Sequence, residues 1–262
     1  MHVYNRGFLG NRLLQHSVAL LIGKRLHQDV DTLRMGDLRE NSDEIIENTL
    51  LHNFLQNGKS YVKTKLWTRE DEEDSQETVV NEQNFLDILS NPNKYINCTV
   101  TTVGGFFQSK EFVLNYKDEI RELFGSAENE PPIDGVFAHF RLKDRLEYTY
   151  EDCLHLKEYF YEAFSTIPNL DIMTKKYISS DSPEHPLIQG LISEFNLTLC
   201  QMSAYQTLSF GARFSHKILS WGSFSWWIGF LNNQNHIIYP DQKRILNKWY
   251  GDIYVFDEWH KV

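Results

Sequence analysis

Strand-like and helical patterns alternate along the C-terminal half of the chain. The strand-like segments are short β-branched or apolar runs, and apolar residues recur at helical spacing between them. The runs lie at 133–141, 175–180, 197–201, 216–221 and 236–240, and the helical segments near 150–165, 185–195, 203–212 and 223–232. This alternation predicts parallel strands joined by crossover helices, and therefore a doubly wound sheet.

The N-terminal half shows the same kinds of pattern at wider spacing. A short apolar and glycine-containing stretch at 3–10 precedes a helical pattern from Arg12 to about His27. Further elements are predicted as a helix at 43–55, a strand at 95–103, a glycine turn at 104–108 and a helix at 110–124 with Ser109 as its cap. A strand followed by a glycine turn and a helix is a common way to form a ligand site in α/β proteins.

An acidic, proline-paired segment at 129–132 separates the two halves. We therefore predict an N-terminal domain over 1–130 and a C-terminal domain over 131–262. The segment 69–77 holds six acidic residues and one arginine, which predicts a solvated surface loop. The expected architecture is two α/β halves that face each other across a cleft.

Composition restricts the kind of ligand that this chain can bind. Hydrophobic residues make up 41% and charged residues 24%, the proportions of a globular protein. Twenty-six basic residues stand against 36 acidic ones, which gives a net charge of −10. Such a chain does not attract a nucleic-acid backbone through its overall field. A phosphate-bearing ligand would have to be bound locally, by a few placed arginines and backbone amides.

The three cysteines, Cys98, Cys153 and Cys200, are widely spaced and form neither a disulfide framework nor a zinc motif. We interpret them as small buried apolar residues in a reducing compartment. The ten histidines show no metal-binding spacing, so no metal is expected. The apolar stretch 17–23 is too short to span a bilayer and lacks the order of a signal peptide. These features predict a cytoplasmic protein without a membrane span.

The segment 139–144 (HFRLKD) ends the first strand of the C-terminal half. Open α/β sheets bind ligands at the carboxyl ends of their strands. Arg141 and Lys143 are cationic donors there, and a planar guanidinium suits bidentate binding of a pyrophosphate. The alternative is a basic surface loop that pairs with Asp144 and Glu147.

The segment 221–227 (WGSFSWW) follows the strand at 216–221. Gly222 permits a tight turn, and Ser223 and Ser225 place hydroxyls and backbone amides at the start of a helix, where an anion can bind without lysine. The alternative is a serine N-cap with aromatic core packing, and in both cases Trp226 and Trp227 are expected in the core.

Asp181 closes the strand at 175–180 and could accept a hydrogen bond from a sugar hydroxyl or a base amine. The alternative is that Asp181 caps the helix that begins near Pro183. The N-terminal loop 7–12 (GFLGNR) matches neither a dinucleotide-binding fingerprint nor a phosphate-binding P-loop. A nicotinamide-dependent oxidoreductase is therefore the least favoured function.

Taken in order, these segments resemble the α-1,2-fucosyltransferases of glycosyltransferase family 11. The family's G-x-L-G-N-Q loop, G-Y-F-Q-S stretch and H-I-R-R-G-D motif are similar to residues 7–12, 105–109 and 139–144. Its F-S-D-D segment, its N-S-S-F-S-W-W-x-x-x-L-N run and its V-I-x-P ending are similar to residues 178–181, 221–232 and 237–240. Among the departures from the family motifs, those that bear on the donor site are Arg12, Leu142, Lys143 and Trp221, in place of glutamine, arginine, glycine and asparagine.

The resemblance implies an inverting, metal-independent transferase of the GT-B type, with two Rossmann-like domains and GDP-fucose as donor substrate for a glycan acceptor. Arg141 would hold the donor pyrophosphate, while Ser223 and Ser225 would receive its phosphates. Asn11 would face the donor from the N-terminal domain, and Asp181 would lie near the nucleotide. The motif neighbours expected in the donor site are Gly10, His139, Lys143 and Phe224.

The resemblance leaves two points open. Asp144 is our candidate general base because it follows the donor motif, with Asp134 and Asp181 as alternatives. The departures from the family motifs keep two further functions open. One is a transferase of another nucleotide sugar, such as GDP-mannose, GDP-rhamnose or a UDP-sugar. The other is a non-catalytic module that binds a nucleotide sugar.

Overall fold

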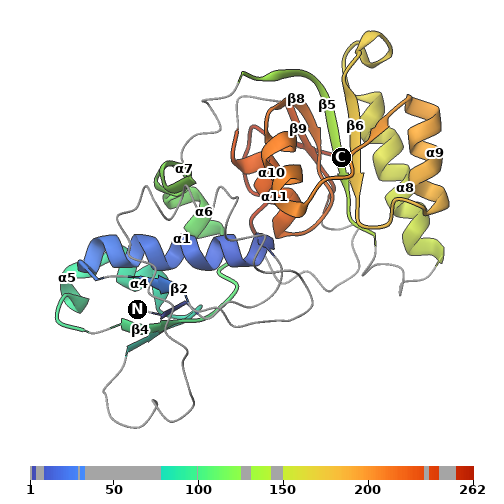
Figure 1. Cartoon of the computed structure of the whole chain (residues 1–262). Coiled ribbons are helices and arrows are strands. Elements are labelled where there is room, and N and C mark those ends of the chain that lie inside the picture. Colours follow the sequence, from blue (N-terminus) through green and yellow to red (C-terminus); the bar gives the residue numbers. More distant parts are fainter. Residues whose placement is uncertain are drawn as a thin grey trace. The chain divides into compact units, whose positions relative to one another are not determined.

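The structure, a computed structural model, describes residues 2–3, 9–28, 30–32, 78–98, 100–124, 131–142, 150–232, 236–241 and 252–262. The predicted helix at 43–55 and the acidic segment 69–77 lie outside these residues, as do Lys143 and Asp144. The chain divides into two compact units, Met1–Gly125 and Ser126–Val262 (Figure 1).

The first unit contains a parallel four-stranded sheet in the order β2-β1-β4-β3. Its strands are β1 (His2–Val3), β2 (Asp31–Thr32), β3 (Thr78–Val80) and β4 (Val100–Val103). Helix α1 (Leu9–Leu26) connects β1 to β2 and packs on the sheet with nearly all its residues buried. The other described helices are α4 (Phe85–Ser90), α5 (Pro92–Tyr95), α6 (Lys110–Asn115) and α7 (Lys117–Phe124).

Two predicted elements of this unit differ from the structure. The helix predicted at 110–124 is divided into α6 and α7 at Tyr116, which leaves the helical conformation and packs its ring against Phe112. The strand predicted at 95–103 begins only at Val100, because Pro92 starts the short helix α5 in front of it. Ser109 caps α6 as predicted, since its hydroxyl accepts a hydrogen bond from the Phe112 amide.

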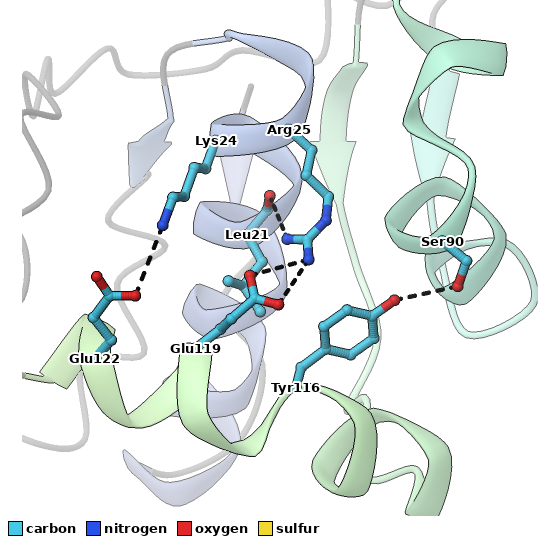
Figure 2. Close-up of polar contacts among 7 residues, drawn as sticks. All are labelled: Leu21, Lys24, Arg25, Ser90, Tyr116, Glu119 and Glu122. Carbon is cyan, nitrogen blue, oxygen red and sulfur yellow. Dashed lines mark hydrogen bonds and ion pairs between the residues drawn. The ribbon is translucent and has the colours of Figure 1, made fainter.

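Polar contacts join α1 to α7 (Figure 2). Arg25 Nη2 lies 2.9 and 3.0 Å from the two carboxylate oxygens of Glu119, and the Arg25 guanidinium lies 5.1 Å from the centre of the Tyr116 ring. Lys24 and Glu122 form a longer pair at 3.8 Å with both side chains largely exposed. The first of these pairs is the better placed to hold α7 against α1.

The second unit is a parallel six-stranded sheet in the order β10-β9-β8-β5-β6-β7. Its strands are β5 (Ile133–Phe140), β6 (Lys176–Ser180), β7 (Thr198–Leu199), β8 (Phe214–Ile218), β9 (His236–Tyr239) and β10 (His260–Lys261). Counted along this unit, the order is 3-2-1-4-5-6, the strand order of the Rossmann fold. The predicted doubly wound sheet is confirmed, with β10 as an edge strand that the sequence pattern does not indicate.

Helices cover both faces of this sheet (Figure 1). Helices α8 (Tyr150–Ser165) and α9 (Pro186–Phe195) lie on one side, and α10 (Ala204–Ala212) and α11 (Ser223–Phe230) on the other. A short 3₁₀ helix, Leu170–Ile172, follows α8. β5 is buried from Gly135 to Phe140, as a central strand covered on both faces must be.

The packing of the second unit agrees with the expected core positions. Trp226 and Trp227 are fully buried, and Trp226 Nε1 donates a hydrogen bond to the Ile253 carbonyl at 2.7 Å. A Cβ at Gly211 would lie 2.6 Å from a ring carbon of Phe137, so this glycine permits the close approach of α10 to β5. Among the described helices, none combines the length and apolar character that a membrane crossing requires.

Candidate functional site

The strand order of the second unit places the candidate site between β5 and β8. From β5 the chain continues to β6 and β7 on one side of the sheet, whereas β8 leads to β9 and β10 on the other. Loops at the carboxyl ends of two such strands diverge and leave a crevice in which ligands bind. The register pairs Ala138 with Ile218, so His139 and Arg141 lie at the same end of the sheet as Ser220 and Gly222. We call these carboxyl ends of the two strands the β5–β8 edge.

Ser220 joins the ends of the two strands. Its hydroxyl accepts a hydrogen bond from the Arg141 backbone amide at 3.1 Å and lies 3.5 Å from His139 Nδ1. The His139 ring is 5.0 Å from the ring of Phe224 in the first turn of α11. His139 and Arg141 from one predicted motif and Phe224 from another are therefore gathered at one edge of the sheet.

His139 contributes no positive charge to this edge near neutral pH. Burial, and then the neighbouring Arg141 guanidinium, lower the pKa of His139 from 6.5 to about 3. The imidazole is therefore neutral and packs as a polar ring between Ser220 and Phe224. Arg141, which is partly exposed, supplies the cationic group that the sequence predicts at this position.

Helix α11 begins at this same edge. Its N-cap is Gly222, which has a φ of 115° and no side chain to cap the helix. The first main-chain hydrogen bond of the helix runs from the Trp226 amide to the Gly222 carbonyl at 3.0 Å. The amides of residues 223–225 therefore lie at the positive end of the helix dipole, before the ladder begins. The alternative of a serine N-cap is wrong, because Ser223 is the first helical residue.

The Ser225 hydroxyl is occupied within the protein. The side chain is fully buried, and Ser225 Oγ accepts a hydrogen bond from the Ser220 amide at 2.8 Å. The sequence predicts that Ser225 receives a phosphate, but its hydroxyl serves the turn between β8 and α11. Only the backbone amide of Ser225 is therefore a candidate for contact with an anion.

Asp181 lies beside Arg141 at the end of the neighbouring strand. The β5–β6 register pairs Phe140 with Ser180, and an Asp181 carboxylate oxygen accepts a hydrogen bond from the Leu142 amide at 2.7 Å. The alternative role of Asp181 as a helix cap is wrong, because α9 begins at Pro186 and is capped by His185 Nδ1. Asp181 instead fixes the backbone immediately after Arg141.

Leu142 and Asp134 bear on the motif and on the general base. Leu142 takes the place of the second motif arginine and is fully buried in the core. Asp134 lies at the opposite end of β5 from Phe140, about 20 Å away along the strand. Asp134 therefore does not reach the edge that holds Arg141. Asp144 and Lys143, the remaining residues of the motif, lie outside the described residues.

In the first unit, Gly10 and Asn11 occupy the start of α1. Asn11 Oδ1 accepts a hydrogen bond from Gln108 Nε2 at 2.8 Å, and Gln15 Nε2 donates to the Gly105 carbonyl at 2.8 Å. The first turn of α1 and the GFFQS segment, 97 residues apart at their Asn11–Gln108 contact, therefore lie together at the carboxyl end of β4. These residues belong to the first unit, and the other described candidates to the second.

Sequence patterns do not indicate two residues at the β5–β8 edge. Ser220 is one of several serines near strand ends, and Tyr254 lies in a segment without strand or helix periodicity. Tyr254 is buried, and its hydroxyl contacts the carbonyls of Ser220 and Gly222. Within the described ranges, no group of three or more histidine, cysteine or acidic side chains is arranged to hold a metal ion.

Comparisons with known proteins concern the fold. No family model matches the chain, and no curated protein matches its sequence. The structure of an arginine-to-lysine mutant of Arabidopsis thaliana FUT1 in complex with GDP is 8% identical, with a TM-score of 0.51 over 88% of this chain and 68% of that one. A structure of POFUT1 in complex with GDP is 10% identical, with a TM-score of 0.40 over 88% of this chain and 94% of that one.

The likeness to FUT1 shows a shared fold. Together with the Rossmann strand order of the second unit, it confirms the predicted class, α/β of the GT-B type.

Proposed function

We propose that this protein is a glycosyltransferase that binds a GDP-sugar, and that it transfers L-fucose from GDP-fucose to a hydroxyl of a glycan acceptor with inversion. The FUT1 structure that shares its fold contains GDP. The motif resemblance points to the same donor class through residues in both units. The fold and the motifs support the same donor class, although the sequence identity to FUT1 is only 8%.

The observation that carries the proposal is the meeting of Arg141 with the start of α11 at the β5–β8 edge. In a chain of net charge −10, a diphosphate has to be bound by local groups such as a guanidinium and the first backbone amides of a helix, which make no hydrogen bond within the helix. Each charge-assisted hydrogen bond contributes about 1.5–3 kcal/mol. Local contacts of this strength compensate for the unfavourable overall charge.

In the proposed mechanism, the acceptor hydroxyl oxygen bonds to the anomeric carbon as the bond from that carbon to the β-phosphate oxygen breaks. GDP leaves with the bonding electron pair, and Arg141 and the α11 amides stabilise the developing charge. The hydroxyl proton passes to a general base, for which we propose Asp144. Attack from the face opposite the leaving group inverts the anomeric configuration. No step requires a metal ion.

Leu142 favours a second candidate, a transferase of the same class with another nucleotide sugar. The second cation of the family motif is replaced here by a buried core residue, so the phosphates lose one contact from this position. A changed phosphate contact is compatible with a different base or sugar. The donor panel described next distinguishes the two candidates.

The test is the thermal stability of the protein against GDP, UDP, CDP, GDP-fucose, GDP-mannose and UDP-sugars, in the presence of a chelator. A ligand at about 100 times its dissociation constant stabilises the folded state by about 2.7 kcal/mol, a shift of a few degrees at this size. We expect a shift with GDP and GDP-fucose alone. A shift with another nucleotide or nucleotide sugar would replace GDP-fucose as the proposed donor. The absence of a shift with every nucleotide would contradict the proposed function.

A non-catalytic binding module gives a different result. Such a module binds the donor, but neither hydrolyses it nor transfers its sugar. Release of GDP from GDP-fucose, with and without glycan acceptors, therefore separates the enzyme from the module.

A further inference from the structure

The C-terminal segment Asp252–Val262 contributes a side chain to the β5–β8 edge. It ends in β10, which pairs with β9 at the margin of the sheet. Its Tyr254 is buried beneath the turn between β8 and α11. Tyr254 Oη lies 2.8 Å from the Ser220 carbonyl oxygen and 3.0 Å from the Gly222 carbonyl oxygen. Both carbonyls belong to the turn that leads into the first amides of α11.

Three groups around this turn form a closed circuit of hydrogen bonds. The Ser220 amide donates to Ser225 Oγ, and the Ser225 hydroxyl is hydrogen-bonded to Tyr254. Tyr254 donates its single proton to the carbonyls of the turn. Because Tyr254 gives its only proton to these carbonyls, the hydrogen bond between the two hydroxyls uses the Ser225 proton. The circuit fixes the peptide planes from Ser220 to Gly222 and thereby the direction of the amides that follow.

The same circuit is connected to Arg141. The backbone of Ser220 belongs to the circuit, and the Ser220 hydroxyl oxygen accepts a hydrogen bond from the Arg141 backbone nitrogen at 3.1 Å. Burial raises the pKa of Tyr254 far above its ordinary value, so the hydroxyl keeps the proton that it donates.

The Ser220–Ser225 hydrogen bond holds the turn from inside, and Tyr254 adds contacts from a distant part of the chain. Gly222 has a positive φ, and the N-cap makes no side-chain hydrogen bond to α11. A glycine turn has more accessible conformations than any other, and only some of them direct the helix amides to one point. In the described structure, Tyr254 restricts this freedom from a position 32 residues away.

We propose that Tyr254 is a positioning residue for the nucleotide diphosphate: its hydroxyl holds the β8–α11 turn in the shape in which the α11 amides and Arg141 bind the phosphates. This inference rests on the proposed function and extends it, because it makes the C-terminal segment part of the nucleotide site. Tyr254 itself does not touch the phosphates.

The test uses Tyr254→Phe, with Tyr159→Phe as its matched control. Tyr159 is likewise a buried tyrosine, and its hydroxyl donates to the Leu219 carbonyl at 2.6 Å, one residue before Ser220. Each variant removes one buried hydroxyl that is hydrogen-bonded to a carbonyl just after β8. Both should therefore lower the melting temperature by similar amounts. Calorimetric titration with GDP should show affinity roughly tenfold weaker for Tyr254→Phe and within about twofold of wild type for Tyr159→Phe.

Ser225→Ala opens the circuit from its other side and serves as the second variant if Tyr254→Phe does not fold. It should weaken GDP binding to a similar degree, and the double variant should lose little more, because the two hydroxyls act through one circuit. Wild-type affinity for GDP in Tyr254→Phe would overturn the positioning role and leave the proposed function standing. If Tyr254→Phe does not fold, wild-type affinity for GDP in Ser225→Ala would do the same. Equal weakening in Tyr159→Phe would also overturn it. A wild-type protein that does not bind GDP would overturn the proposed function itself.

Discussion

At the scale of single residues, Arg141 connects the sequence motif to the structure. It stands one residue beyond β5, and its backbone amide is bonded to Ser220 from β8. The neighbouring His139 is neutral and Leu142 is buried. Among the described residues of the motif, the Arg141 guanidinium is therefore the positively charged group. Bidentate hydrogen bonding by that guanidinium is what lysine cannot reproduce.

Replacement of Arg141 by lysine should therefore lower kcat/KM by roughly 10- to 100-fold, because the positive charge remains while the paired donors are lost. Release of GDP from GDP-fucose measures the rate, and calorimetry measures GDP affinity. Arg213→Lys is the control, since Arg213 precedes β8 at the other end of the strand and donates to the Pro131 carbonyl. Near-wild-type rates in Arg141→Lys would remove Arg141 from the phosphate site.

At the scale of elements, the boundary between α6 and α7 creates a contact that a continuous helix would not. The break at Tyr116 lets that ring lie beside Arg25 while α7 presents Glu119 to the same guanidinium (Figure 2). The sequence at 110–124 reads as one helix because apolar spacing continues across the break. The structure interrupts the helix at Tyr116, whose ring lies beside Arg25 of α1.

The two ion pairs between α1 and α7 provide an internal comparison. Glu119→Gln should destabilise the first unit by about 1 kcal/mol, because Arg25 is only 20% exposed and its Nη2 contacts both carboxylate oxygens. Glu122→Gln should change stability by less than about 0.3 kcal/mol, because its partner Lys24 is 3.8 Å away and largely exposed. Urea unfolding at low and high salt measures both variants. Equal effects of the two substitutions would contradict this assignment.

At the scale of the whole molecule, each unit contains a buried neutral histidine. Burial, and then the Arg12 charge, lower the pKa of His16 in α1 to about 4, and His139 in β5 has a pKa of about 3. Both values lie below the 6.5 of an unfolded chain, so at mildly acidic pH the unfolded state binds protons that the folded state does not. The stability associated with these histidines is complete above pH 6.5 and is lost as the pH falls.

Each unit should therefore lose about 2 kcal/mol of unfolding free energy between about pH 7 and pH 5 from its buried histidine. Urea unfolding across this range measures the loss, and His16→Leu should flatten the dependence of the first unit. His155→Gln, at an exposed position on α8 in the second unit, should leave the profile of the first unit unchanged. A His16→Leu profile parallel to that of wild type would contradict the prediction.

Several features of this protein follow from its sequence alone. Period-two and period-3.6 patterns report how each segment meets a core, so the parallel α/β class and the main helices and strands of the C-terminal half follow from order along the chain. Arg141 and the start of α11 are likewise local signals, because a strand end and a helix start are marked by neighbouring residues. The net charge requires that a phosphate ligand be bound by such local groups.

The tertiary structure decided what these signals do together. The strand order 3-2-1-4-5-6 places β8 beside β5, and only then does Ser220 meet Arg141, 79 residues earlier in the chain. The tertiary structure also buries Leu142, bonds the Ser225 hydroxyl to the Ser220 amide and places the Tyr254 hydroxyl against the Ser220 carbonyl. Hydrophobic periodicity records burial but not strand order, register or the partner of a buried hydroxyl. Those depend on contacts between distant segments, which exist only once the sheet has formed.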